Sequence, residues 1–276
     1  MVLKRIGIFP SLKKQEAIQL GLELCDYLQQ RGIEPVIREE LQTDVPWKIE
    51  KFPPVKVDLA LSLGGDGTLL QCAHYVWDEC PILGVNLGNL GFLTASDGGK
   101  IYQDLERILR GDFIVQERDL IRVQFKGKEF YGLNECAISQ VNVGKIFTLS
   151  LEVNGIRMGE LRGDGVIVST ATGSTAYALS CNGPLISPLL HVLLLCVISP
   201  HSLSTRPLVL SPEDRIKISL PQGELGLLVM DGQERVPLSA GDELSLTLAS
   251  RKVKLVFFEE DFFLRLIPKK LLWGHP

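Results

Sequence analysis

The fold is decided by the stretch Val57-Asp58-Leu59-Ala60-Leu61-Ser62-Leu63, followed at once by Gly64-Gly65-Asp66-Gly67-Thr68. The first seven residues are mostly aliphatic, as in a strand that is buried on both faces of a parallel sheet. Residues 69–76 suit a helix, and Thr68 is its expected N-cap. A strand, a glycine-rich turn and a helix N-terminus together form a site where backbone N–H groups can bind phosphate.

Asp66 is the unexpected residue of this turn, because a carboxylate repels phosphate. An acid at this position indicates removal of a proton from a hydroxyl group, or contact with a metal ion. The alternative is a tight turn in which the Asp66 side chain bonds its own backbone. We expect the glycines at 64, 65 and 67 to adopt positive φ and to let the backbone approach a ligand closely.

Strand and helix patterns alternate on both sides of this turn. Strands are expected at 4–9, 34–38, 57–63 and 81–86, and helices at 15–31 and 104–110, each closed by a glycine. This alternation predicts a Rossmann-like parallel α/β domain with helices on both faces of the sheet. Ligands of such domains bind at the carboxyl ends of the strands, where Asp66 and Asn86 fall.

From about Phe113 the pattern changes to short runs separated by turn signals such as Asn154-Gly155. We expect a buried strand within the apolar run 189–198, which is too short to span a bilayer. The other expected strands lie at 120–125, 148–153, 165–169, 215–220, 225–230, 243–248 and 252–257.

The predicted organisation is therefore an α/β domain at 1–112 and an all-β, β-sandwich-type domain at 113–256. A helix expected from Phe262 to Trp273 returns to the first domain, so residues 257–276 are assigned to it.

Composition narrows the functional classes. The formal net charge of −4 gives no basic surface for nucleic acid, so we expect no nucleic-acid partner. The N-terminus lacks a signal peptide, and the six cysteines include no CxxC pair, which predicts reduced thiols and a cytoplasmic protein. Cys72, His74 and Cys80 lie close together but lack a fourth ligand, so structural zinc is not expected.

Three groups in the second domain carry chemistry. Asn134 and Glu135 can hold the vicinal hydroxyls of a ribose, although a surface turn is the alternative. The run 162–180 leads from a strand into small hydroxyl residues and a helix, which suits phosphate or a nucleotide edge. Asp231-Gly232-Gln233, taken alone, predicts a hairpin turn.

Taken together, these motifs resemble those of NAD kinases, and the resemblance covers nearly the whole chain. The match is specific because Asn134-Glu135 accompanies Thr172-Gly173-Ser174-Thr175-Ala176-Tyr177, whereas Gly-Gly-Asp-Gly alone also occurs in phosphofructokinases and lipid kinases. The other matching segments are Gly84-Val85-Asn86-Leu87-Gly88-Asn89-Leu90-Gly91-Phe92-Leu93, Gly163-Asp164-Gly165, Asn182-Gly183-Pro184, Pro200-His201-Ser202-Leu203-Ser204-Thr205-Arg206-Pro207 and Asp231-Gly232-Gln233.

The resemblance implies phosphoryl transfer from ATP to the 2′-hydroxyl of the adenosine ribose of NAD, giving NADP. It casts Asp66 as the general base and Asn134 and Glu135 as ribose-binding residues. It places Asp164 near the nicotinamide, and it implies a divalent metal, normally Mg²⁺, and a homodimer or homotetramer. The remaining NAD-binding residues are Gly67, Lys145, Arg162, Thr175, Ala176, Tyr177, Ala178, Leu179, Ser180 and Gln233, and the phosphate loop is Gly64, Gly65, Gly67 and Thr68.

Departures from the family pattern remove none of these groups; Ala171, for example, stands where proline is usual. No Walker A motif and no Rossmann G-x-G-x-x-G occurs, so neither nucleotide is expected to bind in those ways. Two alternatives remain at this stage: a lipid or sugar kinase of the same superfamily, and a non-catalytic NAD(P)-binding sensor. ATP and polyphosphate both remain open as phosphoryl donors.

Overall fold

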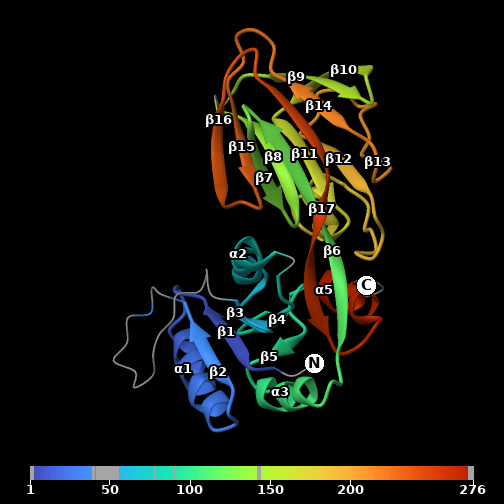
Figure 1. The fold of residues 1–276 in the computed structure, drawn as a ribbon. Helices are drawn as coiled ribbons and strands as arrows, with labels where there is room; N and C mark the ends of the chain where they lie inside the picture. The colour runs from blue at the N-terminus through green and yellow to red at the C-terminus, as the bar shows by residue number, and fades with distance from the viewer. Residues whose placement is uncertain are drawn as a thin grey trace. The chain divides into compact units, whose positions relative to one another are not determined.

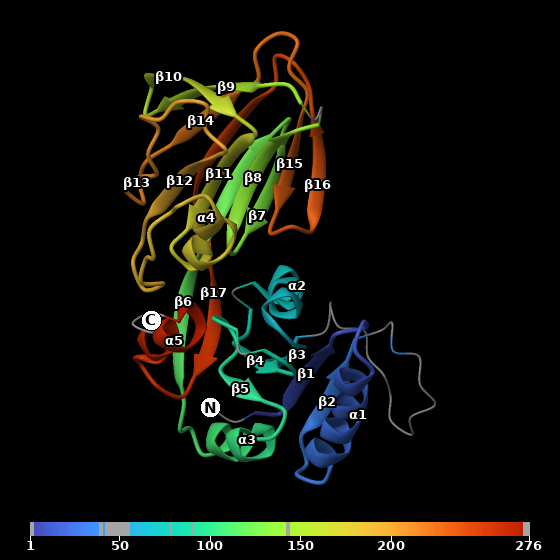
Figure 2. The same ribbon diagram turned by 180° about the vertical axis from the view of Figure 1, so that it is seen from behind.

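The structure, a computed structural model, describes residues 3–38, 41, 56–77, 79–89, 91–141 and 144–272 (Figures 1 and 2). Contacts divide the chain into two compact units. Unit 1 comprises Met1–Glu117 and Val253–Pro276, and unit 2 comprises Arg118–Lys252. No helix in the described part of the chain is long and apolar enough to cross a membrane.

Unit 1 is built on a parallel sheet with the strand order β2-β1-β3-β4. The short strand β5 and the last part of β17 also run parallel to β4, the latter through the pair Leu255 and Ile82. The elements of this unit are β1 (Arg5–Pro10), α1 (Gln15–Gln29), β2 (Glu34–Ile37), β3 (Leu59–Gly64), α2 (Asp66–Val76), β4 (Ile82–Asn86), β5 (Ser96–Asp97), α3 (Ile101–Leu109) and α5 (Phe262–Leu271).

The helices of unit 1 lie on both faces of this sheet. Leu24 and Leu28 of α1, and Leu105 of α3, pack with Ile8 and Leu61 of the strands in one buried cluster. Helix α2 contributes nothing to that cluster, and Figure 1 shows it on the other side of the strands from α1 and α3. All six residues of β3 are buried, as expected for a central strand covered on both sides.

Unit 2 consists of two antiparallel sheets. One contains β10-β9-β14-β17, with β6 beside β17 and β7 beside β6, and the other has the order β13-β12-β11-β8-β15-β16. The elements are β6 (Ile114–Phe125), β7 (Lys128–Gly132), β8 (Glu135–Gln140), β9 (Phe147–Val153), β10 (Ile156–Gly163), β11 (Gly165–Thr170), the 3₁₀ helix η1 (Thr172–Thr175), α4 (Tyr177–Ser180), β12 (Leu193–Ile198), β13 (Leu208–Leu210), β14 (Ile216–Ser219), β15 (Gly226–Met230), β16 (Glu234–Leu238) and β17 (Glu243–Phe257).

The main core of unit 2 lies between its two sheets. Val123 of β6 and Ile218 of β14 pack in one cluster with Ile138 of β8 and Val168 of β11. The outer face of the second sheet has a smaller cluster, in which Ala178 of α4 and Ile186 pack on Ile167 of β11. Helix α4 therefore lies against a sheet face (Figure 2), which fixes the segment that leads into it.

The predicted fold class is confirmed: a parallel α/β part is followed by a two-sheet β part, and the C-terminal helix α5 belongs to unit 1. Trp273, the expected last residue of that helix, lies outside the described residues. Gly32 and Gly111 follow α1 and α3 with φ of 72° and 79°, as expected for helix stops.

Several predicted boundaries were wrong. Helix α3 begins at Ile101, not at residue 104, and the runs 243–248 and 252–257 form one strand, β17. Thr68 is not an N-cap, because α2 already begins at Asp66 and its N-cap is Gly65. The strands that the sequence patterns do not predict include β5, β8, β10, β13 and β16.

Candidate active site

The carboxylate of Asp66 is held at the N-terminus of α2 by a second loop. Its Oδ2 accepts a hydrogen bond of 2.8 Å from the backbone N–H of Phe92, and its Oδ1 one of 3.1 Å from that of Leu93. A Cβ atom on Gly91 would lie 1.8 Å from Oδ1, so only glycine permits this approach. The alternative of a turn in which Asp66 bonds its own backbone is not what the structure shows.

The glycines around Asp66 act differently from the expectation. None of Gly64, Gly65 and Gly67 has a positive φ, and Gly65 is extended with φ −152°. A Cβ on Gly64 would lie 2.3 Å from Oγ1 of Thr68, whereas one on Gly65 or Gly67 would meet nothing within 4 Å. Gly64 therefore relieves a steric clash, while Gly65 and Gly67 leave the backbone open to the surroundings.

Neighbouring loops converge on the carboxyl ends of β1, β3 and β4. The N–H of Ser11 donates to the carbonyl of Leu63, and that of Leu87 to the carbonyl of Gly64, at 2.8 and 2.7 Å. The ammonium of Lys14 donates to the carbonyl of Leu87 at 2.5 Å. This edge of the parallel sheet thus combines a fixed carboxylate with open backbone and a nearby cation, as expected for a ligand-binding edge.

Asn134 and Glu135 lie where β7 turns into β8, and they are buried, with relative exposures of 9% and 8%. The surface-turn alternative for this pair is therefore wrong. Three consecutive backbone N–H groups, those of Leu133, Asn134 and Glu135, donate to the carboxylate of Asp231 at 2.7, 2.8 and 3.0 Å.

Burial, together with the negative charge of Asp231, raises the pKa of Glu135 from 4.5 to about 8, while a hydrogen bond from the backbone of Tyr177 acts in the opposite direction. Its Oε2 is buried without a hydrogen-bond partner among the described residues. A buried polar atom of this kind is costly unless a ligand satisfies it. Glu135 is therefore prepared to bind a polar group.

Two hydroxyl groups of the segment before α4 support the backbone of this pair. Thr170 Oγ1 donates to the carbonyl of Leu133 at 2.7 Å, and Ser169 Oγ to that of Asn134 at 3.0 Å. Gly173 packs so closely that its Cβ would lie 2.2 Å from the carbonyl oxygen of Asn134. Ser169 and Thr170 are both buried against backbone.

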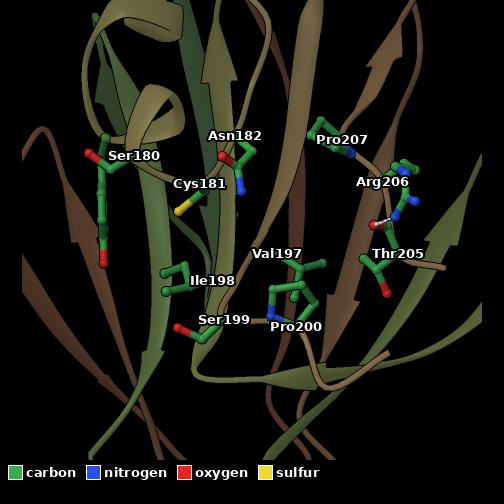
Figure 3. A pocket seen from close by; sticks show the side chains of 11 residues that line it. Ser180, Cys181, Asn182, Val197, Ile198, Ser199, Pro200, Thr205, Arg206 and Pro207 are labelled. Carbon is green, nitrogen blue, oxygen red and sulfur yellow. Dashed lines mark hydrogen bonds between the residues drawn. The ribbon is translucent and has the colours of Figure 1, made fainter. Parts of the chain in front are cut away.

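A pocket of about 630 Å³ lies in unit 2 next to α4. Figure 3 shows its wall in three groups, which are Ser180 to Asn182, residues 197–200 and residues 205–207. Tyr177 also lines it, so two predicted site residues, Tyr177 and Ser180, contribute to this pocket. The guanidinium of Arg206 is held beside the pocket by the carbonyls of Leu203 and Thr205, at 2.6 and 2.9 Å.

The other predicted residues are spread over unit 2. Lys145, Arg162, Asp164 and Gln233 are exposed and do not line this pocket. Asp164 accepts a hydrogen bond of 2.8 Å from the side chain of Gln140. Of the remaining residues near α4, Ala178 is buried, and Thr175, Ala176 and Leu179 are partly buried.

Several residues of these sites were not predicted. Gly91 and Asp231 lay in motifs that had been noted, but no sequence signal showed that both contact the chemistry-bearing residues. Arg206, which lines the pocket, stands in a motif noted above without an assigned role, and Cys181, which also lines it, has none either. No cluster of three or more His, Cys, Asp or Glu side chains suited to a metal ion occurs among the residues that the structure describes.

Comparison with known proteins gives consistent matches over the whole chain. The family model of the ATP-NAD kinase N-terminal domain matches residues 6–113, and that of the ATP-NAD kinase C-terminal domain matches residues 133–258. An NAD kinase of Geotalea daltonii is 38% identical over 282 residues, covering 99% of both chains. An NAD kinase of Methanothermobacter thermautotrophicus is 33% identical, covering 99% of this chain and 98% of its own.

Two solved structures share the fold. A yeast NADH kinase complexed with NADH superposes with a TM-score of 0.86 and 24% identity, covering 100% of this chain and 89% of its own. An NAD kinase from Archaeoglobus fulgidus in complex with ATP has a TM-score of 0.77 and 24% identity, covering 97% of this chain and 98% of its own.

Proposed function

The chain belongs to the NAD kinase family, and we propose that Asp66 is the general base of its reaction. The enzyme transfers a phosphoryl group from ATP to the 2′-hydroxyl of the adenosine ribose of NAD, giving NADP and ADP. Neither a sensor nor a lipid or sugar kinase is favoured by these relatives.

The observation that carries the base assignment is the anchoring of the Asp66 carboxylate by the amides of Phe92 and Leu93. Each carboxylate oxygen has about two lone-pair sites, so both keep one after accepting an amide. As the 2′-oxygen attacks the terminal phosphorus of ATP, its proton passes to Asp66 and the bond from phosphorus to ADP breaks. A fixed carboxylate needs no reorientation for this step.

The phosphate loop in this proposal is Gly64, Gly65, Gly67 and Thr68. Support comes from the first turn of α2, whose N–H groups lie at the positive end of the helix dipole. The open surroundings of Gly65 and Gly67 suit close approach of phosphate or dinucleotide to the backbone. The ammonium of Lys14, which donates to the carbonyl of Leu87, brings a positive charge to the loop after β4.

Asn134 and Glu135 are the proposed ribose-binding pair. The pair combines amide donors and an amide acceptor with a buried carboxyl oxygen that has no partner among the described residues. With a pKa of about 8, Glu135 is largely protonated near neutral pH, so it can donate to a ribose oxygen as well as accept.

The pocket beside α4 is proposed to take a further part of NAD, because Tyr177 and Ser180 line it. A volume of about 630 Å³ is in the range of small-molecule sites. The neighbouring residues Thr175, Ala176, Ala178 and Leu179, and the exposed Lys145, Arg162, Asp164 and Gln233, complete the proposed NAD contacts.

We propose Mg²⁺ as the metal that accompanies ATP. Mg²⁺ usually binds one or two protein carboxylates together with substrate phosphates and water, and the donor set here fits because Asp66 retains a free lone-pair site on each oxygen. When bound, the ion neutralises phosphate charge. The base role and the metal contact of Asp66 can fall on different oxygens.

We further propose a cytoplasmic location and a homo-oligomer, either a dimer or a tetramer. All six cysteines are free thiols, as in proteins of reducing compartments. The edge strand β10 exposes Ile156 and Met158, with relative exposures of 67% and 54%, and such an apolar edge favours association with another chain.

A coupled assay tests the function. Purified protein receives NAD, ATP and Mg²⁺, and NADP is measured with an NADP-specific dehydrogenase. We expect metal-dependent NADP formation, and a kcat lower by about 10²–10⁴-fold in Asp66→Asn with NAD binding retained. Asp97→Asn is the matched control, because Asp97 Oδ1 also accepts two backbone N–H groups, those of Gly99 and Lys100, before a helix. Normal turnover by Asp66→Asn would disprove the base role.

A further inference from the structure

At the turn between β7 and β8, three backbone N–H groups donate to the carboxylate of Asp231 instead of to backbone carbonyls. Its Oδ1 accepts from the N–H groups of Asn134 and Glu135, and its Oδ2 from that of Leu133. In return, the N–H of Asp231 donates to the carbonyl of Glu135 at 3.0 Å. Consecutive N–H groups that converge on one anion form a nest, which fixes the direction of that backbone segment.

The position of Asp231 is itself closely determined. It lies in the hairpin turn between β15 and β16, where Asp231 and Gly232 have φ of 47° and 70°. Its relative exposure is 7%, and a Cβ on Gly132 would lie 3.0 Å from its Oδ1. A hairpin alone needs no buried carboxylate, so the side chain has a role beyond the turn.

The same carboxylate sets the electrostatic surroundings of Glu135. The other titratable groups that interact with Glu135 are Cys136, Tyr177 and Cys181, whose pKa values are raised first by burial and in part by the charge of Glu135. These three are ordinarily neutral near pH 7, which leaves Asp231 as the charged group of this set. Its negative charge favours the protonated form of Glu135.

We propose that Asp231 is the positioning residue of the Asn134–Glu135 pair: through hydrogen bonds from the backbone N–H groups of Leu133, Asn134 and Glu135 it fixes the orientation in which the pair meets the ribose. This assignment depends on the ribose-binding role proposed above, and no contact of Asp231 itself with substrate is required.

The test is a comparison of Asp231→Asn, Glu135→Gln and Asn134→Ala in steady-state kinetics from pH 6 to 9. An asparagine has one acceptor oxygen, so at least one of the three buried N–H groups loses its partner. We expect Asp231→Asn to raise the KM for NAD about tenfold and to leave the KM for ATP unchanged.

The pH profile separates positioning from simple destabilisation. In the wild type the KM for NAD should change near pH 8, where Glu135 titrates, and Glu135→Gln should abolish this change. Asp231→Asn should lower the pH at which the KM for NAD changes by about one unit or more, because the variant removes a negative charge beside Glu135. The control is Asp214→Asn, whose carboxylate accepts from Ser211 N and Asn154 Nδ2 at 2.8 and 2.6 Å and should leave the profile as it is.

The outcomes are distinguishable. An unchanged KM for NAD and an unchanged pH profile in Asp231→Asn, with effects in Asn134→Ala and Glu135→Gln, would overturn the positioning role alone. No effect in any of the three variants would overturn the ribose-binding proposal together with it. If Asp231→Asn does not fold, Gly132→Ala displaces the same carboxylate more gently, and the same two readouts apply.

Discussion

Oδ1 of Asp66 lies only 1.8 Å from the place where a Cβ atom of Gly91 would stand. The loop after β4 therefore binds the proposed base through the backbone N–H groups of Phe92 and Leu93 alone. A side chain at position 91 would displace the Asp66 carboxylate. Because φ of Gly91 is not positive, the requirement is one of space and not of backbone conformation.

Gly91→Ala should thus impair catalysis with little loss of fold. Displacement of a catalytic group by about 1 Å can lower the rate by about 10²-fold, so we expect kcat to fall by about 10–100-fold. The control is Gly21→Ala in α1, whose Cβ would make only ordinary contacts of 3.4 Å or more. That variant should keep full activity and gain about 0.5–1 kcal/mol of unfolding free energy, measured by urea denaturation. Full activity in Gly91→Ala would contradict the proposed constraint.

Glu135 should make the stability of the protein depend on pH. Its pKa is about 8 in the folded protein against an ordinary value of 4.5, so between these values the folded state holds a proton that the unfolded state has lost. Stability from this group is therefore complete below about pH 4.5 and declines as pH rises to about 8. The Tm of Glu135→Gln, measured by differential scanning fluorimetry, should exceed that of the wild type by a margin that grows as pH is raised from about 4.5 to about 8. A melting difference independent of pH would contradict it.

Cys181 should be the cysteine that reacts first with a thiol reagent in the native protein. It is partly exposed and lines the pocket beside α4, while the other five cysteines are buried. Burial raises the pKa of its thiol, so labelling should be slow near neutral pH and should accelerate as pH rises. We expect NAD to protect it, and Cys181→Ser to remove the fast phase. Labelling unaffected by saturating NAD would argue against NAD in this pocket.

Asp119 should be important for the stability of unit 2. Its side chain is 4% exposed, accepts from Nδ1 of His191 at 2.8 Å and forms an ion pair with Lys252. The Lys252 and His191 side chains are 29% and 58% exposed, so water can solvate the groups that lose their partner, and Asp119→Asn should lose about 1–3 kcal/mol in urea denaturation through its lost charged hydrogen bonds. Glu243→Gln, which breaks the exposed pair with Lys217, is the control and should change little. Equal losses of unfolding free energy in Asp119→Asn and Glu243→Gln would show that the burial of Asp119 does not strengthen its ion pair.

Periodicity and turn chemistry predicted most of the fold. The run 57–63 and the alternation around it were enough for the parallel sheet, because strands buried on both faces carry a continuous apolar pattern. Strand β10 had no such pattern, since most of its residues are exposed or partly exposed. Residues 249–251 interrupt the alternation of β17, so the pattern predicts two strands where the structure has one.

The candidate site was harder to predict where its geometry depends on distant residues. Thr68 has the chemistry of an N-cap, but the loop after β4 binds Asp66 and α2 begins there. Asn134 and Glu135 looked compatible with a surface turn, because their burial depends on Asp231, which is close in space but far along the chain. Hairpin chemistry explains the turn at Asp231 and gives no sign of where its carboxylate points.

The return of β17 to unit 1 has a consequence for biosynthesis. Leu255 pairs with Ile82, so the N-terminal sheet obtains this neighbour only after nearly all of unit 2 has been translated. Residues 118–252 form a compact unit with its own core, and they include all of β17 before Val253, where the chain re-enters unit 1. The β part of the chain is thus available to fold before the last strand of the first part has been made. Strand β5 already pairs with β4 at Val85 and Asn86, so the edge around Ile82 is the surface that a nascent-chain chaperone would meet.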